Sequence, residues 1–340
     1  MSNTTINLPA YLTRIQLPSQ PLPLPTLSTL CTICQQHNRH IPFENIDVVL
    51  QRHIHIDLPT IEEKLINNHR GGYCFEQNSL LQAVLLQLGF QSVRRCLCRV
   101  CSSMPETPYT HVALVITTSV DDGNDGNDGN DGNDGNDGND VLQQQWLVDV
   151  AFGGKQSVHP ILLGSDEQEQ QLSDGIFRTR NVGNGYTMVE KKALHRPADN
   201  TDNTSIDVKT WHSLYKLRVE ETALDVDCQM GNFWTCKFPT SRFCTQFFIS
   251  RRVPSSAATN NQGKKLQLDQ VKVQLQDEFH YILNNSYVAR SYDNDGISTD
   301  QEITITSKEQ LIELVTNIFH IRLNNKTDFL GLDRYLPEAM

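Results

Sequence analysis

Hydrophobic residues after Cys74 recur with the period of an α-helix. Four of them follow at i, i+3, i+4 and i+7 spacing, and these are Leu81, Val84, Leu85 and Leu88. Gly89 comes next, where glycine commonly ends a helix. The sequence therefore predicts a helix that begins at Cys74, within a mostly helical segment over residues 1–92.

Short runs rich in β-branched and aromatic residues dominate from about residue 93 to 220. They predict strands that build a barrel or a strongly curved sheet. The runs "THVALVITT" and "QQQWLVDVAFGG" are expected to pair as a β-hairpin. Residues 221–340 mix strand patterns with one clear helix, "SKEQLIELVTNIFHI", which Ser307 and Gln310 open with capping-box spacing. We expect an α+β protein whose three units span residues 1–92, 93–220 and 221–340.

The predicted hairpin carries an unusual segment at its tip, residues 121–140. It consists of Asp-Gly-Asn triplets without an apolar residue, and we expect it to be disordered. A long loop adds little closure entropy, about 0.6 kcal/mol for each doubling of its length. The two strands should therefore still pair.

Charge and cysteine content limit the class of protein. The net charge is −11, but eight aspartates lie in residues 121–140, so the rest of the chain carries only −3. No basic stripe indicates a nucleic-acid partner. No signal peptide and no apolar run of about 20 residues is found, which argues against secretion and a membrane partner. Nine cysteines, an odd number at uneven spacing, favour reduced thiols in a cytoplasmic protein.

Candidate chemistry centres on Cys74. A helix start favours a thiolate, and Gly71-Gly72 before it permits close approach of a substrate to the backbone. A cysteine nucleophile needs a base and a group that orients the base. His111 begins one arm of the predicted hairpin, and Asp149 lies in the other arm, where an unpaired carboxylate would be costly. Taken singly, each of the three could be an ordinary core or turn residue, but together they predict a catalytic triad.

The motifs around these residues have the order and approximate spacing of one enzyme family. "YLTRIQLP", "HIPFENIDVVL", "RGGYCFEQN", "THVALVI", "WLVDVAFGG" and "NFWTCKFPTSRFCTQFF" together resemble the arylamine N-acetyltransferases over about residues 11–250. The resemblance implies a helical bundle, a central β-barrel, a C-terminal α/β lid and a papain-like triad of Cys74, His111 and Asp149. It also implies a ping-pong reaction in which acetyl-CoA acetylates the cysteine and an arylamine or arylhydrazine accepts the acetyl group.

Further roles follow from the same resemblance. Glu44 and Arg70 match a buried pair that supports the nucleophile loop. Phe43 and Thr110 are expected at the acceptor substrate. Three positions are expected to touch the cofactor, namely Thr107, Trp234 and Thr240. The sequence departs from common choices of the family at Tyr73, Phe75 and Ala151, which bears on acceptor preference and cofactor entry.

Other interpretations remain open. An amide hydrolase with the same triad, such as a transglutaminase-like or papain-like peptidase, would ignore CoA, and a descendant without activity would only bind ligands. A zinc site in "CTICQQHNRH" is not expected, because residues three apart on a helix drift by about 60° per step and cannot converge. No metal is therefore assigned.

Overall fold

Helices dominate the N-terminal part of the chain. In the computed structural model, which describes residues 5–102, 106–119, 143–195, 207–254, 277–292, 298–323, 331–332 and 335, five helices come before the first long strand. They are α1 (Leu8–Arg14), α2 (Leu27–His40), α3 (Ile46–Val49), α4 (Leu58–Glu62), which continues as the π-helical turn η1 (Glu63–Asn67), and α5 (Cys74–Gln87). The predicted helix that begins at Cys74 is confirmed.

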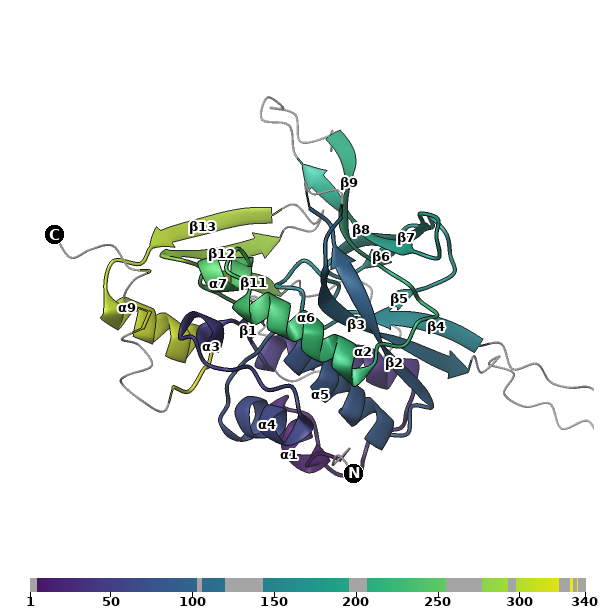
Figure 1. Ribbon diagram of the computed structural model, residues 1–340, viewed down its shortest axis with the longest axis horizontal. Coiled ribbons are helices and arrows are strands. Elements are labelled where there is room, and N and C mark those ends of the chain that lie inside the picture. The colour runs from purple at the N-terminus through teal and green to yellow at the C-terminus, as the bar shows by residue number, and fades with distance from the viewer. Residues whose placement is uncertain are drawn as a thin grey trace, which may run out of the picture.

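Helix α5 lies in the centre of this helical region (Figure 1). Its apolar face packs against side chains of α1 and α2 and against Leu114 and Ile116 of the neighbouring sheet. Gly89 follows the helix with φ of +95°, a conformation that side-chain-bearing residues rarely adopt. The helix that carries Cys74 is thus enclosed by protein on several sides and ends as its sequence predicts.

Eight antiparallel strands form one strongly curved sheet in the order β5-β4-β3-β2-β9-β8-β7-β6. Their bounds are β2 (Ser92–Val100), β3 (Tyr109–Ser119), β4 (Gln143–Val148), β5 (Ile161–Leu162), β6 (Gln170–Leu172), β7 (Gly175–Asn181), β8 (Thr187–His195) and β9 (Asp207–Leu217). The Gln170 side chain on one edge strand bonds both backbone groups of Leu162 on the other, at 2.8 and 2.9 Å. The sheet is therefore nearly closed, as the predicted barrel requires.

Strands β3 and β4 form the predicted hairpin. Their pairing runs from Leu114 opposite Val148 to Ser119 opposite Gln143. The triplet segment 121–140 lies outside the described residues. Asp149 follows β4 instead of lying inside a strand, because its carboxylate accepts a hydrogen bond from the backbone N–H of Ala151 at 2.9 Å and the chain turns there.

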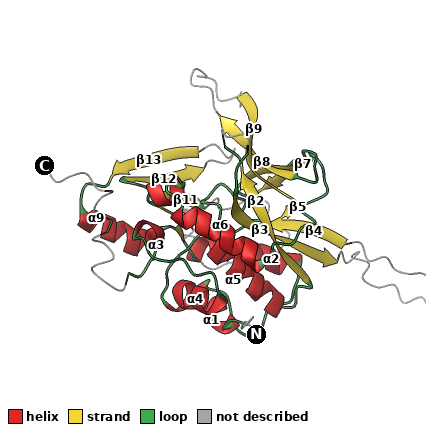
Figure 2. Ribbon diagram, viewed as in Figure 1, coloured by secondary structure: helices red, strands yellow, loops and turns green. Residues whose placement is uncertain are grey.

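The C-terminal part contains a second antiparallel sheet of five strands in the order β1-β10-β11-β12-β13 (Figure 2). It consists of β10 (Phe248–Val253), β11 (Glu278–Leu283), β12 (Ser286–Tyr292) and β13 (Ser298–Thr304), together with β1 (Phe43–Glu44) from the N-terminal part. Helix α9 (Lys308–Glu313) and the π-helical turn η3 (Leu314–Ile318) pack on this sheet. Ser307 caps α9 by accepting from the N–H of Gln310 at 3.1 Å, as predicted.

Helix α6 (Asp225–Lys237), followed by the short α7 (Arg242–Thr245), lies beside strands β2 and β3 of the eight-stranded sheet (Figure 1). The Arg95 side chain on β2 pairs with Asp225, and Thr235 Oγ1 donates to the carbonyl of Thr110 on β3 at 3.5 Å. Helix α6 therefore covers the end of β3 that carries His111. The division at residues 92 and 220 stays a prediction.

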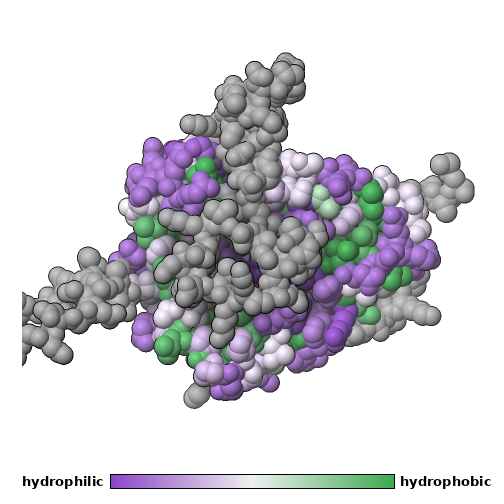
Figure 3. All heavy atoms as spheres, turned by 180° about the vertical axis from the view of Figure 1, so that it is seen from behind, coloured by the Kyte–Doolittle hydropathy of each residue, from purple (hydrophilic) through white to green (hydrophobic). Residues whose placement is uncertain are grey.

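The surface seen from behind is a mixture of hydrophilic areas and smaller hydrophobic ones where it is not covered by grey atoms (Figure 3). The edge strand β13 exposes all seven of its residues, most of them polar. Among the described residues, no helix is long and apolar enough to cross a membrane.

Candidate active site

The turn before Cys74 depends on two glycines. A Cβ on Gly71 would lie 2.2 Å from the carbonyl oxygen of Pro42, and one on Gly72 would lie 2.6 Å from Glu76 Oε2. Real Cβ atoms essentially never lie this close to another heavy atom, so a larger residue would displace the turn or its neighbours. The glycines thus let the chain fold tightly enough to place Cys74 at the first position of α5.

His111 and Asp149 lie next to this thiol. His111 Nε2 is 2.7 Å from Asp149 Oδ2, and both side chains are almost completely buried. The other carboxylate oxygen accepts from the side-chain amide of Asn78 on α5 at 3.1 Å. The Cys74 side chain is 2% exposed and hydrogen-bonds to the His111 ring, with its sulfur 3.8 Å from the carbonyl oxygen of Thr110. The structure therefore brings together the three residues that the sequence predicted as a triad.

The electrostatics of the His111 ring follow from these neighbours. Burial disfavours its charged form, but the negative charges of Asp149 and Cys74 and the hydrogen bonds to them outweigh burial and raise the pKa of His111 to about 10. Burial also disfavours the Asp149 carboxylate, yet the imidazolium lowers the pKa of Asp149 below its ordinary value. The ring is thus a cation that the Asp149 carboxylate stabilises.

Two aromatic rings fix the plane of the imidazole. The rings of Phe152 and Tyr215 lie 4.8 and 4.9 Å from that of His111 and contact each other at 4.9 Å. Tyr215 belongs to the hydrophobic cluster of the eight-stranded sheet, and Phe152, on the loop after β4, packs against that cluster. They exclude water from one side of the histidine and leave its other nitrogen directed to Cys74.

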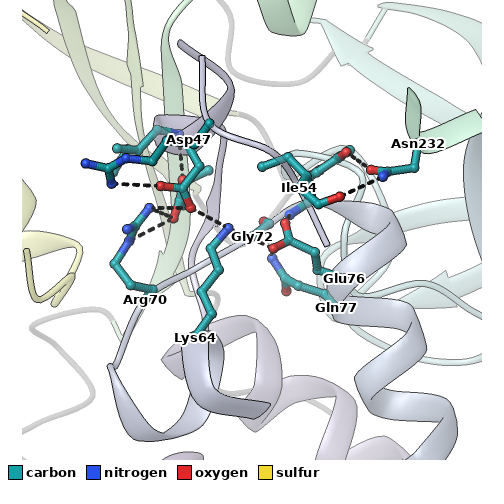
Figure 4. Close-up of polar contacts among 12 residues, drawn as sticks. Asp47, Ile54, Lys64, Arg70, Gly72, Glu76, Gln77 and Asn232 are labelled. Carbon is teal, nitrogen blue, oxygen red and sulfur yellow. Dashed lines mark hydrogen bonds and ion pairs between the residues drawn. The ribbon is translucent and has the colours of Figure 1, made fainter. Parts of the chain in front are cut away.

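A chain of buried ion pairs supports the turn from below. Figure 4 shows Arg70 and Lys64 directed at Asp47, and Glu76 close to Gly72. Arg70 pairs with Glu44 at 2.8 Å and with Asp47 at 3.2 Å, while Lys64 pairs with Asp47 at 2.8 Å and with Glu76 at 2.7 Å. The second oxygen of Glu76 accepts the backbone N–H of Tyr73 at 3.1 Å. The predicted Glu44–Arg70 pair is therefore one end of a longer network that reaches the residue before Cys74.

Gln77 supports the same turn from the other side. Its amide donates to the carbonyls of Pro42 and Gly72, at 3.0 and 2.7 Å. Its oxygen lies 3.1 Å from His37 Nε2, so that nitrogen carries the proton and His37 Nδ1 accepts from the hydroxyl of Tyr11 at 2.9 Å. Burial lowers the pKa of His37 to about 3, which keeps it neutral. The turn is thus anchored to the helical core by a row of neutral hydrogen bonds.

The two residues expected at the acceptor substrate lie near the thiol. Phe43 stacks on Phe248 at 5.6 Å and meets Phe243 edge-on at 6.2 Å, within the hydrophobic cluster that contains Cys74. The Thr110 carbonyl faces the sulfur of Cys74. Aromatic side chains from two separate parts of the chain, Phe43 and Phe243, therefore pack in the cluster that contains the thiol.

The three positions expected at the cofactor are more scattered. Thr107 lies before β3, where its hydroxyl donates to the carbonyl of Val100 at 2.7 Å and its own carbonyl accepts from Arg99. Trp234 on α6 stacks on Phe238 at 4.7 Å, and Thr240 is exposed in the following turn. The structure places them around α6 and the start of β3, and it joins none of them directly to Cys74.

A separate cavity of about 390 Å³ lies between α6 and the segment His53–Asp57. Neither Cys74 nor the other two triad residues line it. Asn232 forms part of its wall, accepts from the hydroxyl of Tyr73 and donates to the carbonyl of Ile54 at 3.0 Å (Figure 4). Tyr73 and Asn232 therefore separate this cavity from the triad.

Sequence reasoning missed the polar residues that support Asp149 and the turn before Cys74. Glu76, Gln77 and Asn78 are buried in the first turn of α5, and each has found buried partners. The sequence did contain an indication of them, because three consecutive polar residues near the start of an otherwise apolar helix need hydrogen-bond partners if they are buried. Among the described residues, no three side chains of His, Cys, Asp or Glu gather into a metal site.

Comparison with known proteins identifies the family. The model of a family described as N-acetyltransferase matches residues 26–123 and 139–268. The arylamine N-acetyltransferase / N-hydroxyarylamine O-acetyltransferase of Salmonella typhimurium is 34% identical over 251 residues, which cover 73% of each chain. The chain belongs to the arylamine N-acetyltransferase family. The resemblance noted in the sequence is confirmed, and the protein is an acyltransferase.

Other relatives agree. The arylamine N-acetyltransferase of Escherichia coli is 33% identical over 67% of each chain. The solved structure of the Salmonella typhimurium enzyme aligns with a TM-score of 0.71 at 27% identity, covering 97% of this chain and 98% of the other. A Mycobacterium marinum arylamine N-acetyltransferase in complex with CoA has the same fold, with a TM-score of 0.71 at 21% identity and coverage of 97% and 100%. The α+β fold with its nearly closed sheet is therefore that of the family.

Proposed function

We propose that the protein transfers the acetyl group of acetyl-CoA to an arylamine or arylhydrazine through an acetyl-Cys74 intermediate. The observation that carries the proposal is the buried row Cys74, His111, Asp149, with 2.7 Å between the histidine and the carboxylate. Family membership supports acetyl-CoA as the donor. In this proposal Cys74 is the nucleophile, His111 the acid and base, and Asp149 the group that orients His111.

In the first half of the reaction, the Cys74 thiolate attacks the thioester carbonyl of acetyl-CoA. The backbone N–H groups at the start of α5 have no acceptor within the helix, and they stabilise the negative oxygen of the tetrahedral intermediate. The C–S bond to CoA then breaks, and the CoA sulfur takes the proton of the His111 imidazolium. The products are free CoA, acetyl-Cys74 and neutral His111.

In the second half, the amine nitrogen attacks the acetyl-Cys74 carbonyl. The Cys74 thiolate is one of the charges that raise the pKa of His111, and acetylation removes it. The pKa of His111 therefore falls once the cysteine is acetylated, and the neutral ring can accept the proton of the incoming amine. Breaking of the C–S bond releases the amide and restores the thiolate beside the imidazolium.

The remaining predicted residues are assigned supporting roles. Phe43 and Thr110, which border the thiol, contact the acceptor, and the aromatic cluster around Phe43 favours a flat aromatic ring there. Thr107, Trp234 and Thr240 contact acetyl-CoA. We place the protein in the cytoplasm, and this is supported by its cysteines, all nine of which are unpaired.

The test uses the pure protein without an amine. Acetyl-CoA should release free CoA in a burst equal to the amount of enzyme, because the first half of a ping-pong reaction can finish alone. Intact mass should show one acetyl group, mapped to Cys74, and an aromatic amine or hydrazine should remove it and restart CoA release. Cys74→Ser serves as the variant that should fold without a burst.

Two results would contradict the proposal. A peptidase or a ligand-binding protein would yield no acetylated thiol and no burst. Acetylation confined to lysines or to the other cysteines would show that the triad is not the site of transfer.

A further inference from the structure

Two cations stand opposite each other in the eight-stranded sheet. Arg99 on β2 and Lys216 on β9 are partners in register. Like charges directly opposite on a sheet repel and destabilise it. Within the described residues neither side chain has a carboxylate ion-pair partner, so no acidic side chain there offsets the repulsion between them. An anion bound between them would offset it.

Two tyrosines hold these cations in place. Arg99 lies over the ring of Tyr109 at 4.0 Å and donates from Nε to the hydroxyl of Tyr186 at 3.2 Å. The two phenol oxygens are 2.7 Å apart. Lys216 and Arg218 lie over the Tyr186 ring at 5.1 and 4.7 Å, although Arg218 also pairs with Glu221 at 2.7 Å. The group is half-buried and preorganised, with positive charge facing outward.

The group lies on the sheet face that contributes a residue to the cluster around the thiol. Successive strand residues alternate between faces, so Arg99 shares its face with Leu97, and Leu97 packs in the cluster that contains Cys74. Two residues along a strand span about 7 Å. Arg99 also donates to the carbonyl of Thr107, one of the residues assigned to acetyl-CoA. A ligand that reaches from this group toward Cys74 would pass along the edge of α6.

We infer that Arg99 and Lys216, with Arg218 beside them, bind the phosphate groups of acetyl-CoA. A guanidinium matches two phosphate oxygens at once, and an ammonium supplies a compact charge. The thioester end of the same molecule then extends toward Cys74. This inference rests on the proposed function for its choice of ligand, and it adds the residues that recognise the charged end of that ligand.

The experiment compares two acetyl donors, acetyl-CoA and S-acetylpantetheine, which has the same thioester arm but no phosphate. Lys216→Gln should lower the second-order rate of Cys74 acetylation by acetyl-CoA roughly tenfold or more, as expected for loss of one charged hydrogen bond. The rate with S-acetylpantetheine should not change. Arg99→Gln should act in the same direction, while Lys216→Arg should retain most of the rate. Lys308→Gln, the same charge change on helix α9, is the control.

Competition identifies the source of the phosphate. Adenosine 3′,5′-bisphosphate should compete with acetyl-CoA in the wild type. In Lys216→Gln its affinity should fall by about the same factor as the rate of acetylation by acetyl-CoA. The inference is overturned if Lys216→Gln slows both donors equally, if it leaves acetyl-CoA unaffected, or if inorganic phosphate competes as well as the bisphosphate. Failure of the proposed function would differ, because the wild type would then acetylate Cys74 with neither donor.

Discussion

Asn78 holds one oxygen of the Asp149 carboxylate at 3.1 Å while His111 holds the other at 2.7 Å. The same asparagine donates to the carbonyl of Val112 at 2.8 Å and accepts from the N–H of Val150 at 3.2 Å. It therefore ties α5, β3 and the loop after β4 together at the point where the triad forms. Helix α5 therefore carries Cys74, the proposed nucleophile, and also holds Asp149, the residue proposed to orient His111.

Asn78→Ala should reduce both activity and stability. The substitution leaves the carbonyl of Val112 and the N–H of Val150 buried without a partner, at a cost of about 1–3 kcal/mol of unfolding free energy. It also frees the Asp149 carboxylate to rotate. If holding that carboxylate in place lowers the activation free energy by about 1.4 kcal/mol or more, kcat/KM should fall at least about tenfold. The matched control is Gln82→Ala, which removes a bond of 2.9 Å from the same helix to Val93. Equal loss of activity in both variants would contradict the orienting role.

Lys64→Met should destabilise the protein in a pH-dependent way. Burial raises the pKa of Glu76 above its ordinary value, and Lys64 opposes that rise. Without Lys64 the folded state holds the proton of Glu76 to higher pH, so stability is lost as pH rises from about 4.5. At neutral pH the unfolding free energy should fall by nearly the roughly 3–5 kcal/mol that is typical of breaking a buried ion pair.

The check on Lys64 is chemical denaturation of both proteins at pH 5 and pH 7.5. The deficit of Lys64→Met should be larger at pH 7.5, and Lys64→Met combined with Glu76→Gln should recover part of it. A deficit that does not depend on pH would mean that Lys64 contributes by packing alone.

The His111 ring should remain protonated through neutral pH in the free enzyme. Its pKa is raised to about 10, so its ion pair stabilises the fold fully below about pH 6.5 and this contribution disappears as pH rises through about 10. Asp149→Asn removes the carboxylate, one of the two groups whose charge raises the pKa of His111, and should move that pKa toward 6.5. NMR of histidine-labelled protein can follow the ring directly, with Cys74→Ser as a second variant that removes the other charge. Unchanged titration in both variants would rule out the charge pairing.

Removal of the triplet segment should leave the enzyme intact. β3 and β4 are already paired as far as Ser119 opposite Gln143, so a short Asn-Gly turn in place of residues 122–139 can close the hairpin. The melting temperature and the burst of CoA release should both stay close to those of the full chain. A large loss of either would assign the segment a role in folding or catalysis.

The helix and strands that form this site could be predicted from the sequence, but most of the buried polar contacts that hold it in place could not. Helical periodicity after Cys74 and the β-rich runs around His111 predicted the elements correctly, because such patterns depend on neighbours in the chain. Asp149 was placed within a strand, and only the turn made by its own carboxylate explains why β4 ends at Val148. The links from Lys64 to Asp47 and Glu76 join three separate helical segments, and no local pattern reports such contacts. Tertiary partners of buried polar residues must be seen in the structure.

The pairing of β1 with β10 has a consequence for biosynthesis. The turn before Cys74 is bonded to the β1 backbone, since the N–H of Glu44 donates to the carbonyl of Gly72 at 3.0 Å. Phe43 in turn pairs with Ser250, which the ribosome adds long after Cys74. At ordinary elongation rates the interval is on the order of ten seconds or more. A nascent chain would therefore carry its thiol for that time without the strand that fixes the turn, and the surroundings of Cys74 would be complete only after Ser250 has been added.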